Sequence, residues 1–125
     1  KMIKNISINI EKTNKYPIVK IKGEIDIYTC GEFRTALSSL VKENTTHFII
    51  DLSELNYIDS TGLGTIAHSA RTIDPNNGHI YIICQKPQIK KIFEVSGLQK
   101  KNISLFEKLE DIELLEGSND WKIII

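Results

Sequence analysis

Residues 29–52, TCGEFRTALSSLVKENTTHFIIDL, contain the pattern that decides the fold. Apolar residues recur at helical spacing within 33–41, which predicts a helix with one buried face. Thr29 and Glu32 have the spacing of a capping box, in which each side chain bonds a free amide of the first turn. The continuous apolar run at 47–52 is typical of a strand buried on both sides. A helix followed by such a strand is the unit from which parallel sheets are built.

Two further strands are expected before this unit. Residues 6–10 alternate apolar and polar, and residues 18–22 form a second β-rich run, so each segment predicts a strand. The polar or turn-forming residues 13–17 connect them, which predicts an antiparallel hairpin. Residues 23–26 are expected to leave the sheet after the second strand.

Alternating helices and strands are expected after the unit. An apolar stripe within 63–73 predicts a second helix, and residues 80–84 predict another buried strand. The remaining predicted elements are a helix from Pro87 to a stop at Gly97, a strand at 103–105 and a short helix at 109–115. Strands separated by helices pair in parallel through right-handed crossovers. The chain is therefore predicted to be one α/β domain with a mixed, mostly parallel sheet, an N-terminal antiparallel hairpin and about four helices.

Composition excludes several classes of protein. Hydrophobic residues make up 41% and charged residues 26% of the 125 residues, which is typical of a globular domain and excludes a disordered or collagen-like chain. Sixteen basic residues balance sixteen acidic ones, so no net field attracts nucleic acid or an anionic membrane. The 23 isoleucines, against ten leucines, favour a sheet with a buried face.

Cysteine usage and the N-terminal residues indicate a cytoplasmic location. Cys30 and Cys84 are too few for a disulfide framework and have no C-x-x-C spacing, so we expect two buried, reduced thiols. The residues at 1–4 lack the apolar region of a signal peptide, and no apolar run approaches the ~18 residues of a membrane span. We therefore expect a soluble, cytoplasmic protein.

The most unusual segment is residues 56–64, NYIDSTGLG. Asp59, Ser60 and Thr61 are each able to cap the helix that follows, and a plain N-cap is one interpretation. However, the two glycines behind them cost about 1 kcal/mol each relative to alanine in a helix interior. The other interpretation is a serine displayed at a helix N-terminus, where free amides and the helix dipole stabilise an added phosphate.

Enzyme interpretations of the same segment are weak. The letters G-x-G-x-x-A at 62–67 match a dinucleotide-binding fingerprint, but that motif must follow its strand at once. Here residues 53–61 are expected to separate the glycine motif from the strand at 47–52. About twenty residues further on, Cys84 or Gln85 stands where an acidic residue would bind the ribose.

The sequence also lacks the residue patterns that a hydrolase or a metal site requires. Ser60 and Gly62 match the last part of the G-x-S-x-G nucleophile elbow, but Ile58 stands where its first glycine would be. His47, His68 and His79 fall on or beside separate predicted elements, and no spacing brings one of them to the serine or forms a metal-binding motif. We therefore expect no enzyme activity, no cofactor and no metal.

Three segments carry a family resemblance. Residues 51–64, DLSELNYIDSTGLG, resemble the signature of STAS domains, specifically of the bacterial anti-sigma factor antagonists. Residues 23–26, GEID, are similar to the family's G-E-[LI]-D turn, and residues 92–98, IFEVSGL, are similar to the segment where its third helix ends. The resemblance covers residues 3–115 as a single STAS-type domain, and implies the mixed sheet with helices that the pattern predicts.

The resemblance also implies a function. In such antagonists the serine that aligns with Ser60 is phosphorylated by an ATP-dependent anti-sigma factor kinase and restored by a PPM-type phosphatase. The unphosphorylated antagonist binds the kinase, which then releases its sigma factor. Thr61 is the less favoured acceptor. The alternative is a STAS domain that acts as a non-switching scaffold or transport-accessory subunit.

The hydroxyl acceptor and its neighbours define an expected partner-binding patch. The second and third strands are expected to be parallel neighbours, so the residues that follow them gather at one end of the sheet. The expected patch comprises Glu24, Asp26, Asp59, Ser60, Thr61, Gly62, Leu63 and Gly64. Residues 116–125 form a C-terminal extension whose Trp121 and final isoleucines are costly to leave exposed. We expect it either to pack on its own domain or to mediate a weak homodimer.

Overall fold

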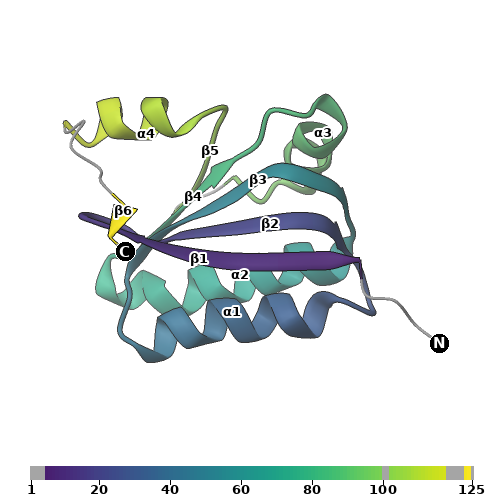
Figure 1. Ribbon diagram of the computed structural model, residues 1–125, viewed down its shortest axis with the longest axis horizontal. Coiled ribbons are helices and arrows are strands. Elements are labelled where there is room, and N and C mark those ends of the chain that lie inside the picture. The colour runs from purple at the N-terminus through teal and green to yellow at the C-terminus, as the bar shows by residue number, and fades with distance from the viewer. Residues whose placement is uncertain (1–4, 100–101, 118–122, 125) are drawn as a thin grey trace.

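The elements follow the predicted order of strands and helices (Figure 1). The structure, a computed structural model, describes residues 5–99, 102–117 and 123–124. Its elements are β1 (Ile6–Thr13), β2 (Ile18–Ile25), α1 (Cys30–Lys42), β3 (His47–Ile58), α2 (Ser60–Ile73), the 3-10 turn η1 (Asp74–Asn76), β4 (His79–Ile83), α3 (Pro87–Ser96), β5 (Ile103–Phe106), α4 (Leu109–Leu115) and β6 (Ile123–Ile124).

The sheet has the predicted mixed topology. Its strand order is β5-β4-β3-β2-β1-β6. β1 and β2 form the antiparallel hairpin, whereas β2, β3, β4 and β5 pair in parallel. β6 adds a short antiparallel strand beside the end of β1, where Ile124 pairs with Lys12 and Ile123 with Thr13. The prediction for Trp121 falls outside the described residues.

Both faces of the sheet are buried, by different helices. Ile50 and Ile49 are adjacent in β3 and belong to two separate cores, because successive side chains of a strand point to opposite faces. The core on the Ile50 side includes residues of α1, α2 and α3, among them Phe33, Ile66 and Phe93. Ile112 of α4 packs in the core on the Ile49 side. Figure 1 shows α1 and α2 side by side along one face and α4 across the other.

Several strands are longer than the sequence predicts, and β1 extends to Thr13. β2 continues to Ile25, so residues 23–25 do not leave the sheet, and β3 continues to Ile58. The pairing between these strands shifts register twice, between Lys20 and Lys22 and between Gly23 and Glu24. Such bulges interrupt the alternation by which a strand is found in a sequence. The extension brings both strands to the same end of the sheet.

Candidate functional site

The carboxyl ends of β2 and β3 form one end of the sheet. Ile25 pairs with Ile58, and the Asp59 amide donates a hydrogen bond of 3.2 Å to the Ile25 carbonyl. Asp26 and Ser60 therefore follow two neighbouring strands at the same end, as expected from parallel pairing. Ligands of open α/β sheets gather beyond this end of the strands.

Asp59 caps helix α2 and leaves Ser60 free. Its Oδ1 accepts a hydrogen bond from the Thr61 amide at 2.9 Å and another from the Thr61 hydroxyl at 2.5 Å. Ser60 is the first residue of the helix and is exposed. Within the described part of the chain, its hydroxyl makes no hydrogen bond. The two adjacent hydroxyls therefore differ, since one is held by the cap and the other faces solvent.

The two glycines behind Ser60 have different surroundings. Gly62 is buried, and a Cβ placed there would lie 2.7 Å from side-chain carbons of both Ile25 and Ile58. Gly64 is exposed, and a Cβ there would meet nothing within 4 Å. Gly62 thus allows α2 to pack closely against β2 and β3, and as a buried residue it offers no contact surface. Leu63 is half-buried and packs against the core.

The loop between β2 and α1 is built around Thr29, and not by a capping box. The Thr29 hydroxyl donates to the Glu24 carbonyl at 2.8 Å and accepts from the Asp26 amide at 2.9 Å, so it makes no cap bond to the helix. The Asp26 carboxylate accepts from the amides of Tyr28 and Thr29. The predicted capping box is wrong because the hydroxyl is already occupied with the preceding loop.

This loop presents large apolar side chains that the sequence interpretation missed. Ile27 is 70% exposed and Tyr28 is 67% exposed, and Tyr57 near the end of β3 is 48% exposed. Glu24 pairs with Tyr57 in the sheet, so these side chains lie at the same end as Ser60. We call Asp26, Ile27, Tyr28, Tyr57, Asp59 and Ser60 the docking surface. The only sequence signal for its three apolar members is that they fall outside every periodic apolar stripe.

Buried Cys30 connects the first turns of α1 and α2. Its Sγ lies 3.4 Å from the Thr61 carbonyl oxygen and 3.2 Å from the Thr65 hydroxyl. Both helices therefore begin at the end of the sheet that carries Ser60, and their positive dipole ends favour an anion there. Cys30 and Cys84 are both buried and free, as predicted, and burial raises the pKa of Cys84 to about 11.

One reason for rejecting a dinucleotide site is wrong, and the other holds. β3 ends at Ile58 and α2 begins at Ser60, so the strand leads directly into the glycine-containing helix. Cys84 and Gln85 nevertheless follow β4, and neither supplies the carboxylate that binds a ribose. Among the described residues, no group of three His, Cys, Asp or Glu side chains could hold a metal ion.

The three histidines lie away from Ser60 along the fold. His47 and His79 begin β3 and β4, and they contact the aromatic rings of Tyr16 and Tyr81. They therefore lie at the opposite end of the sheet from the carboxyl ends of β2 and β3, where the site is. His68 is exposed on α2, two turns beyond Ser60.

Comparison with known proteins identifies the family. A family model described as the STAS domain matches residues 7–112. The anti-sigma-B factor antagonist of Staphylococcus aureus is 32% identical over 96 residues, which cover 75% of this chain and 89% of that protein. The chain belongs to the STAS-domain anti-sigma factor antagonist family. The anti-sigma-B factor antagonist of Staphylococcus epidermidis is 30% identical over 95 residues, covering 76% of this STAS protein and 88% of its relative.

Solved structures share the fold of this STAS protein. An anti-sigma factor antagonist from Mycobacterium paratuberculosis superimposes with a TM-score of 0.79 at 24% identity, covering 88% of this chain and 92% of the other. The Bacillus cell fate determinant SpoIIAA in its phosphorylated form gives a TM-score of 0.66 at 22% identity, covering 87% and 99%. No helix within the described ranges is both long and apolar enough to span a membrane.

Proposed function

We propose that this STAS protein is an anti-sigma factor antagonist that is switched by phosphorylation of Ser60. The observation that carries the proposal is the exposed Ser60 hydroxyl, free of hydrogen bonds in the described structure, at the start of α2. The Thr61 hydroxyl is the poorer acceptor because it donates to Asp59. Unphosphorylated protein binds an anti-sigma factor serine kinase, which then releases its sigma factor. A PPM-type phosphatase restores the serine, and the cycle takes place in the cytoplasm.

The relatives support this assignment by their names. The Staphylococcus proteins are named anti-sigma-B factor antagonists, and SpoIIAA has been solved in unphosphorylated and phosphorylated forms. The last pair indicates that a protein of this fold exists in both states. The switch is therefore proposed to operate without a change of fold.

The docking surface has the composition of a protein interface. Large exposed apolar side chains mark interaction sites, and tyrosine is enriched among the residues that dominate binding energy. Ile27 and Tyr28 are held outward by a loop whose backbone is fixed through Thr29 and Asp26. A preorganised loop loses little conformational freedom when a partner docks. Glu24, Thr61, Leu63 and Gly64 are proposed to border the contact.

One phosphate is sufficient to switch such a surface. It adds about −1.5 to −2 charges at neutral pH, next to the carboxylate of Asp59 and at the same end of the sheet as Asp26. A phosphate that is desolvated without a partner costs about 3 kcal/mol, which is roughly a hundredfold in affinity. In the free protein, the N-terminus of α2 and the surrounding water stabilise the same group. Phosphorylation therefore opposes docking but leaves the domain folded.

Phosphate mapping tests the acceptor. We expect the kinase and ATP to phosphorylate the protein on one residue, and Ser60→Ala to abolish the product. Thr61→Val is the matched control, since it removes the neighbouring hydroxyl and should retain phosphorylation. Mass spectrometry locates the group. Phosphorylation at full level in Ser60→Ala would overturn the assignment and indicate Thr61 or another residue as the acceptor.

The apolar part of the surface has its own test. Tyr28→Ala should weaken kinase binding at least tenfold, because truncation of a buried interface tyrosine costs more than about 1.4 kcal/mol. Val95→Ala is the control, since Val95 is 76% exposed on α3 and lies outside the docking surface. Calorimetric titration with the kinase measures both. Equal affinity of Tyr28→Ala and unmodified protein would remove this loop from the interface.

A further inference from the structure

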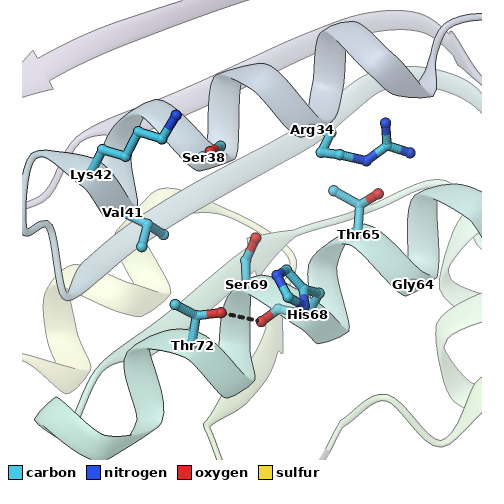
Figure 2. Close-up of a pocket in the computed structure, with 9 residues that line it drawn as sticks. All are labelled: Arg34, Ser38, Val41, Lys42, Gly64, Thr65, His68, Ser69 and Thr72. Atoms are coloured by element: carbon cyan, nitrogen blue, oxygen red, sulfur yellow. Dashed lines mark hydrogen bonds between the residues drawn. The ribbon is translucent and has the colours of Figure 1, made fainter.

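A groove of about 400 Å³ lies between α1 and α2, apart from the Ser60 hydroxyl (Figure 2). Its lining residues are Arg34, Ser38, Val41, Lys42, Gly64, Thr65, His68, Ser69 and Thr72. The volume is within the range of small-molecule sites in proteins. Only Gly64 is shared with the expected partner-binding residues.

The groove is rich in hydrogen-bond donors and carries positive charge. Arg34 and Lys42 belong to the lining, and no lining residue is acidic. This contrasts with the chain as a whole, in which acidic and basic residues are equal in number. Within the described part of the chain, Arg34 makes one weak contact, 3.8 Å from Nη2 to the Cys30 Sγ, so most of its guanidinium donors remain available.

Two serine hydroxyls in the groove lack partners within the described structure. Ser69 is only 6% exposed, and Figure 2 shows its hydroxyl pointing into the space between the two helices. Ser38 lies across from it on α1. Thr65 and Thr72 already donate to the carbonyls of Thr61 and His68, so their oxygens can only accept, and the Cys30 Sγ already lies 3.2 Å from the Thr65 oxygen. The Ser69 Oγ is not among the fully enclosed side-chain atoms without a partner, so it is open to the groove and able to bond a ligand hydroxyl or a water there.

We propose that this groove binds a small phosphorylated polyol of the sugar phosphate class. The Arg34 guanidinium matches the geometry of a phosphate, with which arginine forms paired hydrogen bonds. The serine donors and threonine acceptors suit the hydroxyl groups of a polyol, and Val41 offers an apolar wall to its C–H face. His68 is the one ring in the lining, which has no Phe, Tyr or Trp, so most of its groups suit the hydroxyls of a polyol and few suit the face of a nucleobase. The proposal is independent of the phosphorylation switch.

Ligand titration followed by NMR of the backbone amides tests the site without the kinase. Glucose 6-phosphate, inorganic phosphate and glucose are added separately to the unmodified protein. We expect saturable shifts in α1 and α2 with glucose 6-phosphate, weaker binding of inorganic phosphate and no saturable shift with glucose.

Two arginine variants distinguish a specific site from general charge attraction. Arg34→Gln should weaken glucose 6-phosphate binding at least tenfold, which is the loss of about 1.4 kcal/mol. Arg71→Gln is the control, because Arg71 is exposed on α2 outside the groove lining, and should bind as the unmodified protein does. Absence of saturable shifts, or equal affinity of Arg34→Gln and unmodified protein, would overturn the site. Equal binding of inorganic phosphate and glucose 6-phosphate would overturn the polyol assignment.

Discussion

At the scale of single residues, the two glycines of α2 give a matched pair of predictions. Gly62→Ala should destabilise the fold by about 1–3 kcal/mol, as overpacking of a filled site does, because the new Cβ would lie 2.7 Å from Ile25 and Ile58. Gly64→Ala should be neutral or stabilising by up to about 1 kcal/mol, since alanine is the better helix former and the site is open. Urea denaturation measures both variants. Equal losses in the two would contradict the packing assigned to Gly62.

The sequence predicts the start of α2 better than it predicts the surface around it. The three consecutive polar residues at 59–61 indicate a helix start, but each can serve as a cap, so only the bond from Thr61 to Asp59 shows which one does. Exposure of Ile27 and Tyr28 depends on what packs around them in three dimensions. Neither periodicity nor spacing carries that information.

At the scale of elements, Thr29 is expected to hold the loop between β2 and α1. Thr29→Ala leaves the Asp26 amide and the Glu24 carbonyl without their buried partner. The expected cost is about 1–3 kcal/mol in the free energy of unfolding. Thr29→Ser keeps the hydroxyl and should lose less. Denaturation of both variants tests this, and a larger loss in Thr29→Ser would contradict the role of the hydroxyl.

The start of β4 gives a prediction for pH dependence. Burial, and to a lesser degree the nearby His47, lower the pKa of His79, while Glu116 acts in the opposite direction. The unfolded chain therefore binds a proton at His79 more readily than the folded one. Its contribution to stability is present above the ordinary histidine pKa of about 6.5 and is lost as the pH falls below it.

Urea denaturation across that pH range measures the effect. His79→Gln should reduce the loss of stability at low pH, because the titrating ring is gone. His68→Gln is the control, since His68 is exposed on α2, and should leave the slope unchanged. An unchanged slope in His79→Gln would show that His79 does not contribute to it.

Helices were predicted more accurately than the ends of strands. The apolar stripe of α1 places Phe33, Leu37 and Leu40 in the core as expected. In α2, by contrast, Thr65 and Ser69 are buried along the side that faces α1, so a stripe counted from apolar residues alone misplaced part of the buried face. β2 and β3 run further than predicted because bulges break their alternation.

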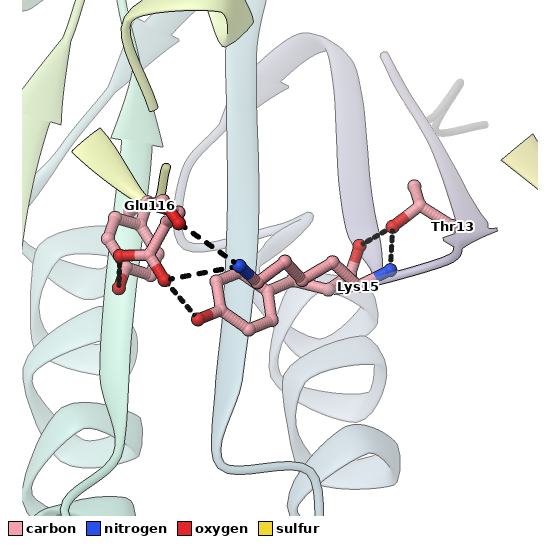
Figure 3. A network of polar contacts seen from close by, with 5 residues as sticks. Thr13, Lys15 and Glu116 are labelled. Carbon is pink, nitrogen blue, oxygen red and sulfur yellow. Dashed lines mark hydrogen bonds and ion pairs between the residues drawn. The ribbon is translucent and has the colours of Figure 1, made fainter. Parts of the chain in front are cut away.

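At the scale of the whole molecule, Glu116 joins the end of α4 to the β1–β2 hairpin and to β4 (Figure 3). Its carboxylate accepts from the Tyr16 hydroxyl at 2.5 Å and from the Tyr81 hydroxyl at 3.2 Å, and Lys15 lies 3.9 Å away. Burial raises the pKa of Tyr16, and the bond to Glu116 adds to the effect. Glu116 is therefore an acceptor that the buried Tyr81 and the half-buried Tyr16 share at the end of the helix.

Removal of that acceptor should loosen α4 from the sheet. Glu116→Ala is expected to cost about 1–3 kcal/mol, because partly buried donors lose their partner. Glu110→Ala, at an exposed position of the same helix, should change stability by less than about 0.5 kcal/mol. Hydrogen exchange of the α4 amides checks the location of the change. Unaltered exchange in Glu116→Ala would show that the contact does not hold the helix.

The overall architecture was predictable because alternating strand and helix patterns permit few topologies. The order of elements, the antiparallel hairpin and the parallel remainder of the sheet were confirmed. β6 was not predicted as a strand, since two residues carry no periodicity of their own. The contact of Glu116 with Tyr16 was likewise not predictable, because the two residues lie 100 positions apart in the sequence.

The central claim is that phosphorylation of Ser60 controls kinase binding, and the affinities of the two forms test it most directly. Calorimetric titration of the kinase with unmodified and Ser60-phosphorylated protein should show at least a hundredfold difference. Ser60→Asp should fall between them, because it adds one charge and lacks the three phosphate oxygens. The difference should persist near 1 M salt, where the Debye length is about 3 Å, if the phosphate is desolvated in the interface. Equal affinity of the phosphorylated and unmodified forms would contradict the account.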